Sequence, residues 1–397
     1  MGRTDTGTWA KAGVAVWIGL LLALTIVTFA APDRQSVLGY YRLGSAGFWA
    51  GTPIYTPATS FGFMYLPTFA VAFTPFELFG ERPGEALWRL VSAGLLTWSL
   101  WRCARRTAPP GRAFEAFGLA LLVAAMGSAA ALQNGQSTTL LTAASLLAFE
   151  AAWERRPLEA AAWATLALIA KPLAIVAWLL VGATRPRTIP WLILLTGLAI
   201  ALPYAVRPAP YVNSLYSDFG ALMMNISPET NAPWNDFRAP FGVVGLRIAP
   251  AAAYAIRALA ALATLATVWG LSRAADPYRA VIAAAALACA YMLLFNPRTE
   301  LNSYVMMAAS FGLAAGVRLA RGDRRGGLWL AVPCIALGLP ELATKTFNPW
   351  LDPLVQGVGL GALLFQLNGP RSRQRPPADP YIGPAGETTA PPPTEPA

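Results

Sequence analysis

Long stretches without charge recur along this 397-residue chain and constrain its fold more than any other feature. The first covers 13–31, and comparable runs of about 15 to 22 residues continue as far as 350–367. A helix needs about 20 apolar residues to cross the hydrocarbon of a bilayer. Only 13% of the residues are charged, against about 25% in an average soluble protein. The sequence therefore predicts an all-α polytopic integral membrane protein with about 10–12 membrane helices.

The loops between these runs are of two alternating kinds. Basic loops such as "RCARRTAPPGR", "ERRP" and "RLARGDRRGG" alternate with mixed-charge loops rich in Asn, Tyr and Trp, such as "LQNGQS" and "FNPRTELNSY". Because Lys and Arg accumulate in cytoplasmic loops, we assign the basic kind to the cytoplasm and the mixed kind to the outside. The net charge of +10 then reflects membrane topology, and no nucleic-acid partner is expected. The predicted spans that follow the first are 86–101, 114–132, 136–153, 189–206, 251–272, 277–295, 302–318, 327–343 and 350–367.

Two apolar stretches do not fit a simple crossing. The run 158–183 has basic residues at both ends and is split by Lys171-Pro172. This pattern predicts two short helices with the pair near their shared tip, a broken arrangement that membrane proteins tolerate where it lines a cavity. The run 64–79 is short and carries two prolines. We expect it to be interfacial or re-entrant.

Composition sets the domain limits and excludes several kinds of site. We expect one transmembrane domain over 1–367, followed by a Pro-rich cytoplasmic tail, 368–397, that is disordered. The chain has no histidine, which excludes imidazole metal ligands and every nucleophile that depends on a histidine base. Its three cysteines show no paired spacing, so neither a disulfide nor a thiolate metal site is predicted.

Polar side chains on the predicted outer face can carry chemistry. Asp33 directly follows the first apolar run and is the candidate general base, because a carboxylate there can deprotonate an acceptor hydroxyl. Arginine and lysine match phosphate oxygens, and aromatic rings suit sugar faces. The candidate substrate-binding residues are Arg34, Tyr40, Tyr41, Arg42, Asn134, Gln136, Lys171, Arg298, Glu300, Asn302 and Tyr304. Together they suit a phosphate-linked lipid donor and a hydroxyl acceptor, which is the hypothesis of glycosyl transfer.

Simpler interpretations exist for most of these residues. Asp33 can merely mark the water boundary of a span, and the tyrosines can belong to an aromatic belt. Arg298 and Glu300 can form an ordinary loop ion pair. Lys171 is different, because a lysine within an apolar run is costly, which favours a functional role.

The order of several stretches resembles glycosyltransferase family 87, whose members have the GT-C fold. These stretches are "YYRLGSAGFWAGTPIYTP", "FMYLPTFAVAFTPFELFG", "LWRL", "NGQSTTLLTAASLLAFE", "ALIAKPLAIV" and "FNPRTELNSY". The resemblance implies an inverting enzyme that needs no metal or other cofactor and transfers a sugar from a polyprenyl-phosphate donor. It also implies a first outer loop with juxtamembrane helices, and an Asp base there, which matches Asp33. The spacing of Asp33 to the tyrosine pair departs from the family pattern, and Asp218 and Asp236 are alternative bases.

The resemblance further implies a mannose- or arabinose-type sugar and a lipid-linked or cell-envelope glycan acceptor. The expected location is the bacterial inner membrane, with a multi-pass chain and an extracytoplasmic active site. An alternative is a transporter or flippase of a lipid-linked sugar that holds phosphate with Arg34, Lys171 and Arg298. A scaffold within an envelope assembly is a third interpretation.

Overall fold

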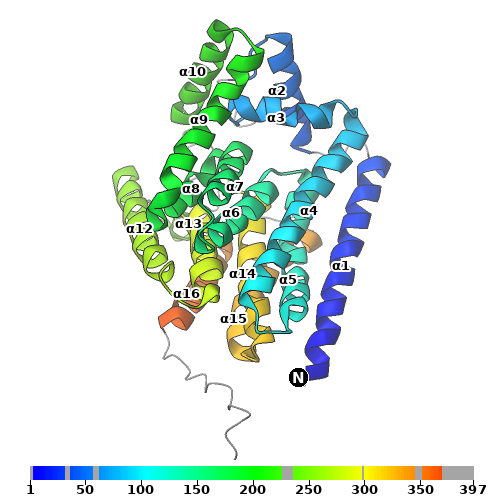
Figure 1. Cartoon of the computed structure of the whole chain (residues 1–397), viewed down its shortest axis with the longest axis vertical. Coiled ribbons are helices and arrows are strands. Elements are labelled where there is room, and N and C mark those ends of the chain that lie inside the picture. Colours follow the sequence, from blue (N-terminus) through cyan, green and yellow to red (C-terminus); the bar gives the residue numbers. More distant parts are fainter. Residues whose placement is uncertain are drawn as a thin grey trace, which may run out of the picture.

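The computed structural model describes residues 3–31, 36–56, 62–225, 236–296, 299–344 and 351–368. Within these ranges the regular structure is entirely helical (Figure 1). The helices in this described part that are long and apolar enough to cross a membrane are Thr6–Ala30, Ala113–Asn134, Pro186–Val206, Pro250–Leu271 and Leu301–Ala320. Shorter apolar helices accompany them. The chain is an all-α polytopic membrane protein, as its uncharged runs predict.

The helices follow one another along the chain in the order α1 to α16. The longer ones are α1 (Arg3–Ala30), α4 (Glu81–Thr107), α5 (Ala113–Asn134), α6 (Thr138–Trp153), α9 (Ile189–Val206), α10 (Ala209–Asn225), α12 (Pro250–Leu271), α14 (Val305–Ala320), α15 (Arg324–Thr344) and α16 (Leu351–Asn368). The shorter ones are α2 (Leu38–Ala50), α3 (Pro67–Glu77), α7 (Pro157–Ala170), η1 (Pro172–Ala174), α8 (Ile175–Thr184), η2 (Pro186–Thr188), α11 (Ala239–Val243), η3 (Tyr278–Ala283), α13 (Ala284–Leu294) and η4 (Leu301–Ser303).

Small residues bring α5 into close contact with its neighbours at the centre of the bundle. Gly118 in α5 lies against the backbone of α1, and Gly316 in α14 lies against the backbone of α5. A Cβ atom at either position would meet a backbone atom of the facing helix. Lipid tails provide no hydrophobic driving force between helices, so close backbone approach at small residues is a main source of packing energy in a membrane. α5 is therefore the central helix of the structure.

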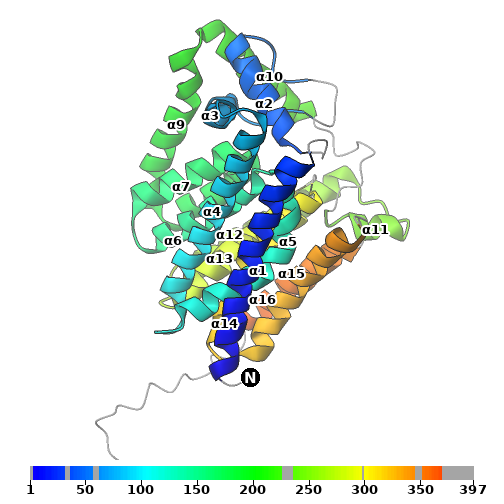
Figure 2. The same ribbon diagram turned by 90° about the vertical axis from the view of Figure 1, so that its right-hand side faces the viewer.

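The helices α2, α3 and α10 lie together at one end of the bundle, which we call the cap (Figures 1 and 2). The N-terminus of α1 lies at the opposite end in both views. α3 has 11 residues, which span about 16 Å, whereas a crossing needs about 30 Å. The run 64–79 thus forms a helix too short to cross, in agreement with its prediction.

The predicted break at Lys171-Pro172 is confirmed. α7 ends at Ala170, Lys171 has extended backbone angles (φ −159°, ψ 128°), and η1 begins at Pro172. Proline removes a backbone donor and restricts the residue before it, which explains why the helix stops here. Lys171 is thereby placed between α7 and α8 and not on the face of either helix.

The basic loops predicted to share one side do meet at one end of the bundle, opposite the cap. Glu150, which is fully buried, pairs with Arg102 at 3.0 Å and with Arg156 at 2.8 Å. Arg321 donates to the carbonyl of Thr107 at 3.0 Å. These contacts join three basic loops that are far apart in the sequence. The predicted grouping of the basic loops is confirmed.

Candidate functional site

The turn between α5 and α6 forms the centre of the candidate site. It contains Asn134, Gly135, Gln136 and Ser137, and it faces the cap. Gly135 has a positive φ of 68°, a conformation that favours glycine. A Cβ atom there would also come within 2.6 Å of the Leu38 side chain in α2. The glycine therefore allows both the sharp turn and the close approach of the cap.

Two tyrosines of the cap hold the turn. The Tyr41 hydroxyl accepts a hydrogen bond from the backbone N–H of Ser137 at 3.1 Å and shares another with the Tyr65 hydroxyl at 2.9 Å. Burial raises the pKa of both tyrosines, and the negative charge of Glu300 raises each further. Both hydroxyls therefore remain neutral hydrogen-bonding groups, and they fix the start of α6 relative to α2.

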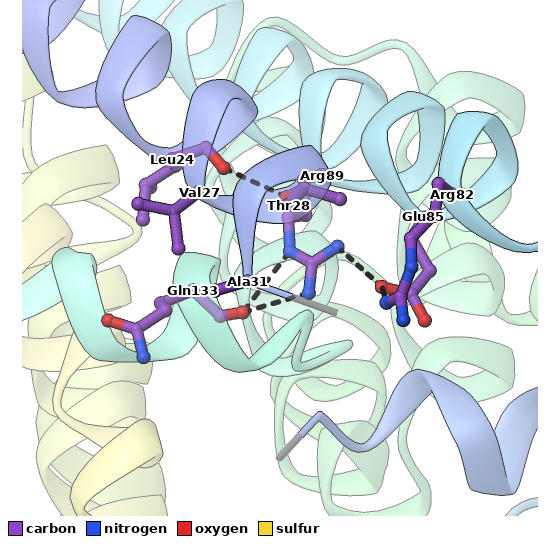
Figure 3. A pocket seen from close by; sticks show the side chains of 8 residues that line it. All are labelled: Leu24, Val27, Thr28, Ala31, Arg82, Glu85, Arg89 and Gln133. Atoms are coloured by element: carbon purple, nitrogen blue, oxygen red, sulfur yellow. Dashed lines mark hydrogen bonds and ion pairs between the residues drawn. The ribbon is translucent and has the colours of Figure 1, made fainter. Parts of the chain in front are cut away.

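α4 holds the same turn from another side. Trp88 donates from its indole nitrogen to the Gly135 carbonyl at 2.8 Å. Arg89 donates twice to the Gln133 carbonyl, at 3.1 and 3.0 Å, and pairs with Glu85 at 3.2 Å (Figure 3). Arg89 also donates to the Ser36 hydroxyl at 3.2 Å, and that hydroxyl donates to the Asn134 carbonyl. α4 therefore ties the chain that enters α2 to the end of α5.

A cation and a carboxylate reach the turn from two further elements. Lys171 donates from Nζ to the Thr138 hydroxyl at 3.1 Å, and Gln136 donates from Nε2 to Glu300 at 3.3 Å. Gln136 Oε1 and Thr139 Oγ1 are buried and have no hydrogen-bond partner among the described residues. Buried polar atoms are nearly always satisfied, by protein, water or a ligand. The segment that Lys171 and Glu300 contact therefore retains polar atoms whose hydrogen bonds the described residues do not satisfy.

An apolar groove of about 570 Å³ adjoins this polar turn. Phe69 of α3 and Leu140 of α6 contribute to its wall, together with residues of α4 and α7. Trp88 and Ala170 lie at the end of the groove that is nearest the turn, because Trp88 bonds to Gly135 and Ala170 directly precedes Lys171. Pockets of this size accommodate small organic ligands. This apolar groove thus ends beside the polar turn.

A family model described as glycosyltransferase family 87 matches residues 63–297, which is more than half of the chain. The chain belongs to glycosyltransferase family 87. A search of curated proteins gives no match. The chain is therefore a membrane glycosyltransferase, with a glycosyl donor and an acceptor as its substrates. The matched part of this family 87 enzyme includes the α5–α6 turn and Lys171, whereas α2 and Glu300 lie outside it.

The structure brings together five of the predicted site residues of the family 87 enzyme. These are Tyr41, Asn134, Gln136, Lys171 and Glu300, which all contact the α5–α6 turn or belong to it. The sequence shows no second carboxylate beside "NGQS", but the fold places Glu300 there. The "NGQS" loop, the Lys171 break and the "FNPRTELNSY" loop thus lie against one another through these two hydrogen bonds.

The other predicted residues of this glycosyltransferase lie elsewhere or outside the described ranges. Arg42 pairs with Glu81 at 2.9 Å and with Glu85 at 3.3 Å. The Tyr304 hydroxyl donates to Asp352 in α16 at 2.7 Å. Tyr40 is exposed on α2, and Asn302 is half-buried in η4. Asp33, Arg34 and Arg298 lie outside the described residues.

Several residues of the site were not predicted. Residue type and position do not single out Tyr65, Trp88, Arg89, Ser137 or Thr138, although all five belong to stretches that carry the family resemblance. A signal was available for Trp88 and Arg89, because an arginine next to a tryptophan within an apolar run needs a partner.

Asp236, an alternative base, has a different environment. It is only 2% exposed and pairs with Arg238 and Arg257, each at 2.8 Å. Two cations hold this carboxylate in place. One of them, Arg257, belongs to α12, so the ion pair attaches the chain at Asp236 to that helix. This arrangement does not favour Asp236 as a base.

Proposed function

We propose that this enzyme transfers a mannose- or arabinose-type sugar from a polyprenyl-phosphate donor to a lipid-linked or cell-envelope glycan. The observation that carries the proposal is Lys171 beside the unpartnered polar atoms of the α5–α6 turn. A lysine supplies a point charge for phosphate, and with the polar atoms of the turn it would form a cradle for that group. A membrane protein that presents such a cradle at the end of an apolar groove suits a donor that is itself a lipid phosphate.

The proposed reaction breaks the bond between the anomeric carbon and the donor's phosphate oxygen. The acceptor hydroxyl attacks the anomeric carbon from the opposite face and gives its proton to Asp33, so that the configuration inverts. Polyprenyl phosphate leaves, and Lys171 stabilises its negative charge. No metal or other cofactor takes part in this proposal. Glu300 and Gln136, which contact each other, are suited to hold sugar hydroxyls.

The choice of Asp33 as base is supported by the contacts of Ser36. Ser36 bonds to Asn134 at the turn and to Arg89. Asp33 lies three positions before Ser36, and three residues of chain reach at most about 11 Å. The proposed base is thus within reach of the turn.

Loop charge supports an extracytoplasmic site in the bacterial inner membrane. The basic loops gather at the end opposite the cap, and basic loops are typically cytoplasmic. The cap and the α5–α6 turn are then on the outer side, where lipid-linked donors meet envelope acceptors.

The test incubates purified protein with a panel of radiolabelled polyprenyl-phosphate sugars and a membrane extract. We expect sugar transfer from at least one donor, and we expect Asp33→Asn to abolish turnover while donor binding persists. Asp323→Asn is the matched control, because Asp323 lies at the basic end, far from the turn, and an asparagine there can still accept the hydrogen bond from Gly326 N–H at the start of α15.

Transfer from no donor in the panel would refute a polyprenyl-phosphate sugar as the donor. A transporter would instead move labelled lipid across the membrane of vesicles that contain no acceptor. Asp33→Asn would then not abolish turnover while leaving donor binding intact.

A further inference from the structure

We propose that Arg155, Arg185 and Arg273 form a binding site for the phosphate headgroup of an anionic phospholipid, in the leaflet at the end of the bundle opposite the cap. These arginines come from three connections: the α6–α7 turn, the junction of α8 and η2, and the chain that follows α12. The α5–α6 turn lies at the other end of α6. Lipid binding at the three arginines is therefore independent of the sugar and its donor.

Hydrogen bonds of Arg185 bring the three connections together. Arg185 donates from Nε to the Ala152 carbonyl at 3.1 Å and from Nη2 to the Ser272 carbonyl at 2.6 Å. The Ala152 carbonyl also accepts from the backbone N–H of Arg155 at 3.2 Å. Arg273 directly follows Ser272 in the chain. Both carbonyls lie at the C-terminal ends of helices, α6 and α12, where free carbonyls attract cations. The fold therefore gathers three positive charges at one place.

These three charges repel one another. Burial lowers the pKa of Arg185, and the charges of Arg155 and Arg273 lower it further. Phosphate oxygens match the planar guanidinium group and carry the opposite charge. A bound phosphate group would thus replace the repulsion between the arginines by attraction to a shared partner.

Acidic residues do lie in the same connections, but they pair with other arginines. Glu154 in the α6–α7 turn pairs with Arg106 at 3.5 Å, and Asp276 in the chain after α12 pairs with Arg321 at 3.1 Å. In the part of the chain that the structure describes, no ion pair joins a carboxylate to an arginine of the proposed site. The three arginines therefore differ from the paired arginines at the same end of the bundle.

Arg155 has a backbone conformation that is unfavourable for an arginine. Its φ is 59°, in the left-handed region that glycine adopts at little cost. Strained backbone is often retained where it serves a function. The side chain of Arg155 is exposed, so packing does not require an arginine here. The turn alone favours glycine, and the arginine at this position indicates a role for its charge.

An apolar surface for the acyl chains adjoins the arginines. The Arg273 guanidinium lies 3.6 Å from the ring centre of Trp269, which is exposed near the end of α12. Leu262 is also exposed and lies seven residues before Trp269, hence two turns away on the same face of α12. Tryptophan is enriched at membrane interfaces, and basic residues there attract anionic lipids. This continuity of cations with an apolar helix face favours a phospholipid over a soluble anion.

The experiment measures lipid binding to the purified full-length protein in detergent by native mass spectrometry. The probes are dioleoyl phosphatidylglycerol and dioleoyl phosphatidylcholine, which have the same acyl chains and differ in net charge. Phosphatidylglycerol should bind at least about tenfold more tightly. Arg273→Gln and Arg155→Gly should each weaken its binding about fivefold, because one basic residue near a membrane surface contributes about this factor. Both variants should bind phosphatidylcholine as the wild type does.

Two comparisons separate charge from structure. Arg105→Gln is the matched control, because Arg105 is exposed and stacks on Trp101, four residues earlier, as Arg273 stacks on Trp269, but belongs to α4, outside the three connections. It should bind phosphatidylglycerol as the wild type does. Arg155→Gly removes the backbone strain. Its melting temperature in lipid-free detergent should therefore be at least that of the wild type, although it binds the anionic lipid more weakly.

Each contrary result overturns the proposed site. Equal affinity for the two lipids shows binding through the acyl chains alone. Wild-type affinity in both variants, or an equal loss in Arg105→Gln, shows attraction by the overall positive charge at this end of the bundle. Displacement of phosphatidylglycerol by millimolar inorganic phosphate shows a site for a free anion and not for a lipid. Sugar transfer is measured separately and is unaffected by any of these outcomes.

Discussion

Replacement of Tyr41 by phenylalanine tests whether the cap holds the α5–α6 turn. Tyr41 is fully buried, and its hydroxyl accepts from Ser137 N–H and bonds to Tyr65. Tyr41→Phe keeps the ring and its edge-to-face contacts with Phe69 and Trp88. It leaves two buried polar groups without their partner, and each such group costs about 1–3 kcal/mol. We expect a loss of about 2–6 kcal/mol in the free energy of unfolding.

The measurement is an SDS titration in mixed micelles, followed by tryptophan fluorescence. Tyr40→Phe is the matched control, since Tyr40 precedes Tyr41 on the same helix and is 38% exposed. The control should change stability by no more than about 0.5 kcal/mol.

A double-variant cycle sharpens the test. Tyr65→Phe should cost at least about 0.5 kcal/mol less in the Tyr41→Phe background, because the Tyr65 hydroxyl then has already lost its partner. Equal stability of Tyr41→Phe and Tyr40→Phe would refute the reasoning, as would strictly additive costs in the cycle.

Three further predictions address the site and the bundle. Lys171→Gln should lower the rate of single-turnover transfer from a radiolabelled donor about 10- to 150-fold, because a hydrogen bond to a charged group contributes about 1.5–3 kcal/mol. An unchanged rate would show that Lys171 does not bind the donor's phosphate. Asp236→Asn should lower the free energy of unfolding by about 2–4 kcal/mol, because the charge of Arg257, which is 12% exposed, then has no carboxylate partner at this position. Calorimetry in detergent measures this change, and an unchanged transition would contradict it. Gly118→Val should separate α1 from α5 and reduce the folded yield in size-exclusion chromatography, whereas Gly19→Val, with open space around it, should not; equal yields would argue against close packing there.

Much of the fold could be predicted because it depends on local properties of the sequence. The uncharged runs predict helices. Pro172 predicts the helix break after Lys171, and the two prolines in 64–79 predict a short helix there. Loop charge predicts which loops meet, and the contacts of Glu150 with Arg102 and Arg156 agree. These properties act over a few residues, so they can be recognised without knowledge of the tertiary structure.

The site could be predicted only in part because its contacts are distant in the sequence. Gln136 and Glu300 are 164 positions apart, and Tyr41 and Ser137 are 96 positions apart. Residue type and position suggested Gln136, Glu300 and Lys171, but the partner of each depends on helix packing. Serine and threonine at a helix start are so common that Ser137 did not stand out. Asp33 as base stays a prediction.

The convergence of distant elements on the α5–α6 turn has a consequence for biogenesis. Asn134 and Gln136 are synthesised early, whereas Glu300 lies between α13 and α14 and leaves the ribosome more than 160 residues later. A nascent chain that has inserted only α1 to α9 already holds Lys171 and the turn but lacks the carboxylate. The order of translation thus delays completion of the site until the helices up to α13 have been synthesised, and a chain truncated before Glu300 lacks its carboxylate.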